Sequence, residues 1–220
     1  MRKFFKRALL LPIACLILSS TAEGRVVDEH IFLIPVGNVD TKMVEAVKDK
    51  LPGFLAARVK VNVEPRREMP EGAYAPSRGQ YYAELVLAGI AQEFNIDTTT
   101  ESILIITDAD LYSQDLDHVF GAADPSKAIG MISIARLRNE FYSLKPDSGL
   151  LLERVVKESL RELGCAWKIP QCSNPECIMY PSDSLKTIDS KKRSFCYKCQ
   201  SKIRNRYFPP IFKAKIPTLL

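Results

Sequence analysis

Residues 154–199 read RVVKESLRELGCAWKIPQCSNPECIMYPSDSLKTIDSKKRSFCYKC, and this stretch decides the fold. Its second half holds two close cysteine pairs, Cys172-x4-Cys177 and Cys196-x2-Cys199, separated by 18 residues. Four thiolates bind zinc tetrahedrally and make a closed, structural site. The stretch therefore predicts one structural zinc within residues 172–199, which fastens a loop-rich part of the chain.

Two other interpretations of the four cysteines stay open. In an exported protein they can form two disulfides. A C-x2-C pair is also the spacing of redox motifs, although no thioredoxin-like context surrounds it here. A fifth cysteine, Cys165, makes the count odd, so at least one thiol is unpaired or has another role. We expect Cys165 to be buried and inert, because no histidine nearby in the sequence would activate it.

The first 22 residues have the composition of a secretory signal peptide. The apolar run 8–18 is too short to span a bilayer comfortably, and small residues at 20–22 supply a cleavage site. The run follows four basic residues, Arg2, Lys3, Lys6 and Arg7. We expect cleavage after Ala22, a secreted or periplasmic protein and no membrane span thereafter; an uncleaved N-terminal anchor is the alternative.

Removal of this segment changes the charge balance. The remaining chain has 27 basic and 26 acidic residues, a net charge of +1, so the formal +5 gives no indication of a nucleic-acid partner. Residues 186–215 hold ten Lys or Arg against one acid, Asp189. This basic surface is either a solvated face or a contact for an anionic partner.

The pattern of apolar runs predicts an α/β fold with a mostly parallel sheet, since strands and helices alternate. The expected strands are 30–36, 59–63, 102–107 and 129–137, with a short strand or bend at 119–123. The expected helices are 41–55, 78–94 and a long one at 150–167. We predict one domain, residues 23–220, in which the cysteines replace a core after Pro170 and residues 207–220 form a surface tail.

Several segments together carry a family resemblance. They are LIPVG (33–37), AYAPSRGQYYA (73–83), TDADLY (107–112), VFGAAD (119–124), ISIARL (132–137), RVVKE (154–158), CIM (177–179) and FCYKC (195–199). With these segments the chain resembles the archaemetzincins, a family of zinc metalloproteases related to the metzincins. The resemblance implies a metzincin-like twisted sheet, a long active-site helix and a Met-turn at Met179, which we interpret as a core methionine.

The family signature H-E-x-x-H-x-x-G-x-x-H-C aligns without gaps with residues 161–172. Its three histidines would hold a catalytic zinc with one open position for water, and its glutamate would be the general base. The resemblance places Glu162 at the general base. The three ligand positions fall on Arg161, Cys165 and Gln171, and the turn glycine falls on Lys168.

The sequence has two histidines in total, His30 and His118, so three histidine ligands from one chain are impossible. An arginine remains protonated in a protein and cannot ligate a metal. We therefore expect an exported pseudo-peptidase without catalytic zinc, in which Glu162 is idle. The Arg161 guanidinium would either occupy the place of the metal and pair with a carboxylate, or be an ordinary cleft arginine.

The alternative is an active zinc metallopeptidase that uses other ligands, such as Cys165, Glu162 and an acid from a loop. A degenerate cleft could still bind a peptide or protein partner by adding a strand to the sheet edge. The sequence places that edge at residues 129–137. His30 and His118 are expected to be structural or surface residues.

Overall fold

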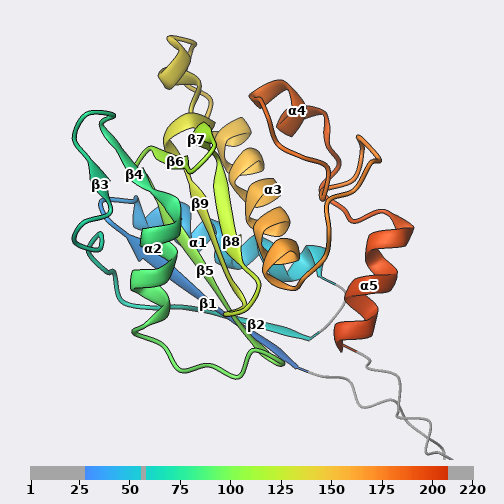
Figure 1. Ribbon diagram of the computed structural model, residues 1–220. Helices are drawn as coiled ribbons and strands as arrows, with labels where there is room; N and C mark the ends of the chain where they lie inside the picture. The colour runs from blue at the N-terminus through green and yellow to red at the C-terminus, as the bar shows by residue number, and fades with distance from the viewer. Residues whose placement is uncertain (1–27, 56–57, 208–220) are drawn as a thin grey trace, which may run out of the picture.

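The computed structural model describes residues 28–55 and 58–207, which form a five-stranded sheet, a smaller four-stranded sheet and covering helices (Figure 1). The strand order of the large sheet is β2-β1-β5-β9-β8. Its strands are β1 (Glu29–Val36), β2 (Val59–Val63), β5 (Glu101–Thr107), β8 (Gly121–Asp124) and β9 (Ile129–Ser133). The first four strands in this order are mutually parallel, and β8 returns antiparallel to β9. The predicted α/β fold with a mostly parallel sheet is confirmed.

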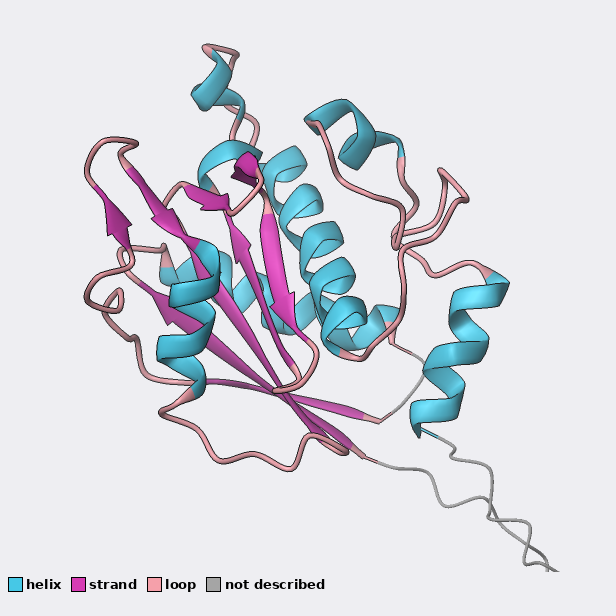
Figure 2. Ribbon diagram, viewed as in Figure 1, coloured by secondary structure: helices cyan, strands magenta, loops and turns pink. Residues whose placement is uncertain are grey.

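Helices cover both faces of this sheet (Figure 2). The helices are α1 (Thr41–Lys50), α2 (Ala83–Ala91), α3 (Ser148–Ala166), α4 (Leu185–Ser190) and α5 (Tyr197–Tyr207), with 3-10 turns at Leu51–Phe54, Ala135–Leu137 and Asn139–Tyr142. Leu104 and Ile106 of β5 pack in the core of α1 and α3, whereas Ile103 and Ile105 pack in the core of α2. Burial on both faces explains why β5 has the continuous apolar sequence SILII.

Two predicted boundaries were wrong. The helix predicted at 78–94 begins only at Ala83, because Gln80–Tyr82 forms strand β4. That strand belongs to the small sheet, whose order is β3 (Tyr74–Ala75), β4, β6 (Leu111–Ser113) and β7 (Leu116–Val119). The strand predicted at 129–137 ends at Ser133, where Ala135 N–H donates to Ser133 Oγ over 3.2 Å and a 3-10 turn begins.

Helix α3 is buried on almost all sides, including its charged residues. Asp147 caps its first turn by accepting from Leu150 N–H over 2.9 Å. The Arg154 guanidinium makes a bidentate pair with Asp189, and Lys157 Nζ donates to the carbonyl of Ile188 over 3.1 Å. The chain after Pro170 therefore covers the polar side of α3, which an isolated amphipathic helix would expose to water.

The same C-terminal segment has a core, contrary to the expectation that cysteines replace one. Its buried apolar residues, Ile178, Met179, Ile188, Phe195 and Ile203, are part of the cluster that α1 and α3 form with the sheet. Met179 packs directly against Gly164 of α3. The core interpretation of Met179 is thus confirmed, and short helices α4 and α5, which the sequence did not predict, belong to this segment.

The predicted signal peptide, residues 1–22, lies outside the described residues, and so does the predicted tail 207–220 except for Tyr207, the last residue of α5. In the described part of the chain, no helix has the length and apolar character needed to cross a membrane.

We predict that Gly164→Ala lowers the free energy of unfolding by about 1–3 kcal/mol through overpacking. A Cβ at this position would lie 2.4 Å from Met179 Sδ. The loss is expected although alanine favours a helix over glycine by about 1 kcal/mol. Gly149→Ala in the same helix is the control, since its Cβ would meet only Asp147 Oδ1, at 3.5 Å. Urea denaturation measures both, and equal stabilities of the two variants would contradict the prediction.

Candidate functional site

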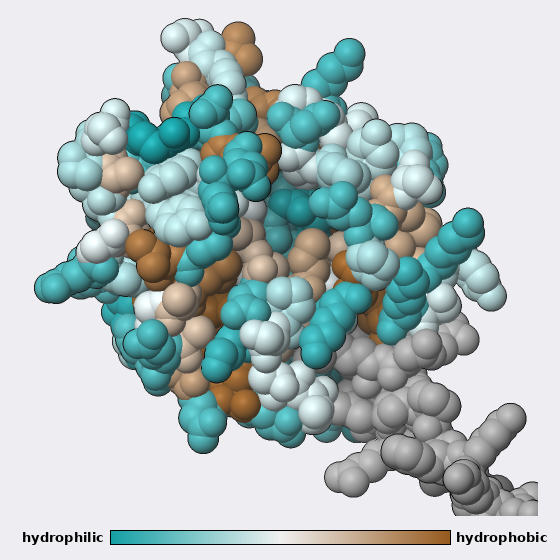
Figure 3. Space-filling model, viewed as in Figure 1, coloured by the Kyte–Doolittle hydropathy of each residue, from teal (hydrophilic) through white to brown (hydrophobic). Residues whose placement is uncertain are grey.

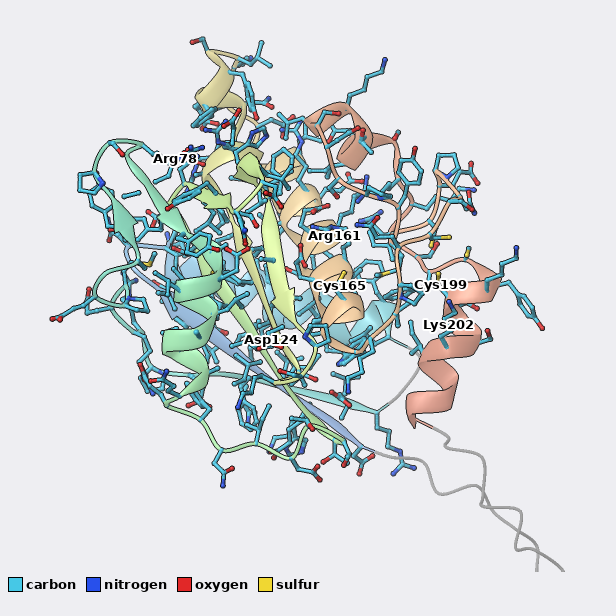
Figure 4. All side chains as sticks on the ribbon, in the orientation of Figure 1. Arg78, Asp124, Arg161, Cys165, Cys199 and Lys202 are labelled. Atoms are coloured by element: carbon cyan, nitrogen blue, oxygen red, sulfur yellow. The ribbon has the colours of Figure 1, made fainter. Side chains whose placement is uncertain are left out.

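An open cleft of about 640 Å³ lies over helix α3, between strands β7 and β8 on one side and residues 181–183 on the other. The general-base position and the three ligand positions of the family signature all line it: Glu162, Arg161, Cys165 and Gln171. Figure 3 shows a hollow in this face of the molecule, and Figure 4 shows Arg161 and Cys165 on α3 beside β8 in the same region. The structure thus brings the predicted site residues together.

The Arg161 guanidinium is held between two glutamates of its own helix. Its Nε donates to Glu158 Oε2 over 2.9 Å, and its Nη2 donates to Glu162 Oε1. The Arg161 side chain is 13% exposed, and its exposed part lines the cleft. Burial alone would lower the pKa of Arg161, but Glu162 and Glu158 outweigh it and raise the pKa above its usual value. Arg161 is therefore a fixed cation in the floor of the cleft.

A second buried ion pair lies next to this arginine. Lys191 Nζ donates to Glu158 Oε1 over 3.2 Å, and both side chains are 0% exposed. Ser182 Oγ donates to the same oxygen over 2.7 Å, and Lys191 also donates to the carbonyl of Tyr180. Burial would raise the pKa of Glu158, but Arg161 and Lys191 together lower it. Glu158 is thus ionised and joins the helix to the segment 180–191.

Glu162 differs from Glu158 in its protonation. Burial raises the pKa of Glu162 to about 7, although the Arg161 guanidinium favours the ionised form. Burial also raises the pKa of the Cys165 thiol to about 11, so this cysteine is a neutral thiol at pH 7. Both a nucleophilic cysteine and a metal-binding cysteine act as the thiolate, and this form is disfavoured at Cys165. The prediction that Cys165 is buried is only partly right, because the residue is half-buried, and its inertness stays a prediction that the raised pKa supports.

Two glycines of the sheet let α3 approach closely at Glu162. A Cβ on Gly121 of β8 would lie 2.6 Å from Glu162 Oε1, and a Cβ on Gly130 of β9 would lie 3.0 Å from the Glu162 carbonyl. Glycine at both positions therefore allows the Glu162 carboxylate to lie directly against the edge of the sheet.

The end of α3 agrees with the ungapped alignment to the family signature. Ile169 N–H donates to the Gly164 carbonyl and Lys168 N–H to the Cys165 carbonyl, which together form a Schellman motif. Lys168 takes the left-handed position with φ of 62°. This is the position that glycine usually occupies, and it is the position of the glycine in the signature.

Beside the cleft, the four predicted cysteines form one cluster. Their sulfur atoms all lie within 4.8 Å of one another, and Cys172 Sγ is 3.7 Å from Cys196 Sγ. A tetrahedral site with Zn–S distances of about 2.3 Å has sulfurs about 3.8 Å apart. All four cysteines are free thiols, and the cluster could therefore hold a structural zinc. Cys172 N–H donates to the Met179 carbonyl, so this cluster is tied to the residues under α3.

Comparison with known proteins identifies the family. The model of peptidase family M54 matches residues 19–205. The chain belongs to this family. It is 32% identical over 177 residues to the archaemetzincin of Methanocaldococcus jannaschii. The aligned region covers 80% of this chain and 94% of that protein. The family resemblance seen in the sequence is confirmed.

Solved structures of the family agree with the fold of this M54 chain. A zinc-dependent peptidase from Methanocorpusculum labreanum has a TM-score of 0.71 and 30% identity, over 79% of this chain and 99% of that one. Archaemetzincin from Methanopyrus kandleri has a TM-score of 0.69 and 31% identity, over 81% and 95% of the two chains.

The predicted peptide-binding edge was placed on the wrong strand. Strand β9, at 129–133, is paired on both sides, with β5 and with β8. The hairpin at Asp124–Ile129 adds β8 outside it, so among the described strands β8 is the edge on this side of the sheet, and it lines the cleft. Sequence alone did not separate the two strands, because the residues of β8 are small and give no apolar run.

Several residues of the site of this M54 chain were not predicted. His118 of β7 lines the cleft, and burial lowers its pKa; its ring packs edge-on against Phe120. His30 lies at the start of β1, in contact with Phe32. The sequence analysis did not identify the buried pair of Glu158 and Lys191. A glutamate on the apolar side of a predicted helix does indicate a buried charge that needs a partner.

We predict that Lys191→Met destabilises the fold by about 3–5 kcal/mol, because it leaves the buried Glu158 carboxylate without one of its cations. Lys192→Met is the matched control. Lys192 pairs with Glu176 over 2.8 Å at the surface, where the two side chains are 64% and 61% exposed. Such a pair contributes about 0–1 kcal/mol. Similar unfolding free energies for the two variants in urea would show that the buried pair has no special role.

Glu162 should make stability depend on pH. Its folded pKa of about 7 is above the ordinary value of 4.5, so between these values the folded state binds more protons than the unfolded state. The contribution of Glu162 to stability is therefore full near pH 4.5 and is lost as the pH rises through 7. The pKa of Glu158 is lowered, so its contribution to stability is lost as the pH falls. This loss occurs only below the ordinary pKa of a glutamate and does not affect the range near pH 7.

We expect the unfolding free energy, measured by urea titration from about pH 5 to about pH 8, to fall more steeply in the wild type than in Glu162→Gln. The difference between the two proteins isolates Glu162 from the other titrating groups. Parallel profiles would mean that Glu162 is ionised throughout this range.

Proposed function

We propose that this chain is an exported member of family M54 without the family's catalytic zinc, and that its cleft binds a peptide or protein instead of cleaving it. The proposal retains one structural zinc at the four cysteines. The observation that carries it is the Arg161 guanidinium, paired with Glu158 and Glu162 at the first ligand position of the family signature.

The residues at the ligand positions do not fit a catalytic zinc. Arg161 stays protonated, and its charge repels a cation. Cys165 is a neutral thiol at pH 7, since burial raises its pKa to about 11, and a carboxamide such as that of Gln171 is a poor zinc ligand. The two histidines, His30 and His118, cannot replace a set of three.

The free edge of β8 supports peptide binding. Within residues 28–55 and 58–207 this strand pairs with β9 alone, and its residues 121–123 line the cleft. A peptide can add to such an edge by main-chain hydrogen bonds. The signal-peptide pattern of residues 1–22 supports export.

Zinc content tests the proposal. We expect one zinc per chain in the reduced protein, lost in Cys172→Ser and kept in Cys165→Ser, which is the matched control because Cys165 is outside the cluster. No cleavage of a mixed peptide pool is expected. The proposal is wrong if two zinc ions bind and peptides are cleaved by the wild type but not by Glu162→Gln. Zinc-free protein with a single free thiol would instead indicate two disulfides.

A further inference from the structure

Arg161 has one nitrogen left for a ligand. Its Nε and Nη2 donate to Glu158 and Glu162, and no hydrogen bond of Nη1 is found within residues 28–55 and 58–207. The guanidinium carries five N–H donors in a rigid fork, and a carboxylate matches that fork. Its two glutamates fix it on α3, so a ligand would not have to order it on binding.

The charges around the cleft leave room for one anion at this point. Lys191 and Glu158 are fully buried and neutralise each other. Arg161 shares Glu158 with Lys191, so the two cations are fully balanced only when Glu162 is ionised, and burial of Glu162 favours its neutral acid. A ligand carboxylate next to Arg161 can take over the charge of Glu162 as Glu162 takes up a proton. His118 is the other basic residue that lines the cleft, and burial favours its neutral form.

The rim of the cleft carries acids. The Asp117 side chain is 97% exposed and pairs with Arg78 over 3.2 Å, and Asp183 is exposed on the opposite side. Like charges at the rim disfavour an acidic stretch of peptide. A peptide whose single negative group is at its end can pair that group with Arg161 and places no other negative charge near Asp117 or Asp183.

Geometry connects this anchor with the free strand edge. Gly121 of β8 lies against the Glu162 carboxylate, which in turn pairs with Arg161. A chain that ends beside Gly121 would thus place its last group near Arg161. We infer that the cleft binds the C-terminal carboxylate of an extended peptide through the Arg161 guanidinium, with the peptide backbone paired along β8. This inference rests on the proposed function.

The test is an NMR titration of the zinc-loaded, ¹⁵N-labelled chain with three probes. They are N-acetyl-trialanine as the free acid, the same peptide as its C-terminal amide, and N-acetyl-Ala-Glu-Ala-amide, which offers only a side-chain carboxylate. We expect the free acid to bind about tenfold or more tightly than either amide. It should shift the amide signals of residues 121–123 and the Nε–H signal of Arg161.

Variants at three positions test the role of the arginine. Arg161→Gln should remove the preference for the free acid, whereas Arg67→Gln, which loses an exposed pair with Glu93, should keep it. Glu162→Gln should bind the free acid at least as tightly as the wild type, because it removes the competing carboxylate. If Arg161→Gln does not fold, Arg161→Lys decides, since it keeps the charge but loses the fork and should bind more weakly.

Equal binding of the free acid and the amide would overturn the inference, as would an undiminished preference in Arg161→Gln. Binding of the glutamate peptide as tight as that of the free acid would overturn the assignment to the chain terminus. These results are distinct from failure of the proposed function, which would appear as a second zinc ion and peptide cleavage.

Discussion

The buried charge cluster on α3 is the constraint on which the rest of the site depends. Glu158 is fully buried and ionised, and it keeps its charge only because Arg161 and Lys191 lie on either side of it. One of these cations comes from the helix and the other from a segment 30 residues later. A buried charge without a partner is strongly unfavourable, so this one requirement fixes where the segment 180–191 lies. The walls of the cleft follow from that placement.

The C-terminal third is held by two different kinds of interaction. Its apolar residues continue the main core, and its charged contacts with Arg154, Lys157 and Glu158 satisfy the buried polar side of α3. The four-cysteine cluster adds a third link, through the hydrogen bond of Cys172 to Met179. Zinc at the cluster would add to the apolar and charged contacts that hold this segment.

The positive charge of Arg161 in the cleft determines which ligand groups can bind there. In a metallopeptidase the metal is the cation that meets an oxygen of the substrate. Here Arg161 provides positive charge at the first ligand position, but a guanidinium offers hydrogen bonds and no open coordination site. It can orient an anionic oxygen, and it cannot generate a nucleophile from water. Recognition of a carboxylate is the chemistry that such a group supports best.

Some features of this protein were determined by local sequence. Continuous apolar runs such as SILII identified the buried strands, because a strand buried on both faces needs no polar alternation. The spacing of the cysteines predicted their cluster, because close pairs make tight turns that present two sulfurs together. The register of the family signature identified Arg161, Glu162, Cys165 and Gln171 as neighbours, and the left-handed Lys168 agrees with it.

The remaining features depend on contacts between distant residues. The order of β8 and β9 at the edge is set by a hairpin whose small residues carry no periodic signal. The protonation of Glu162 and the ion pair of Glu158 with Lys191 arise from burial, which the linear sequence does not specify. The sequence by itself determined that one chain cannot supply three histidine ligands, since it contains only two histidines. Only the tertiary structure decided which charged groups meet at the cleft. The reason is that the interaction energy of two charges depends on their distance and on how much water surrounds them.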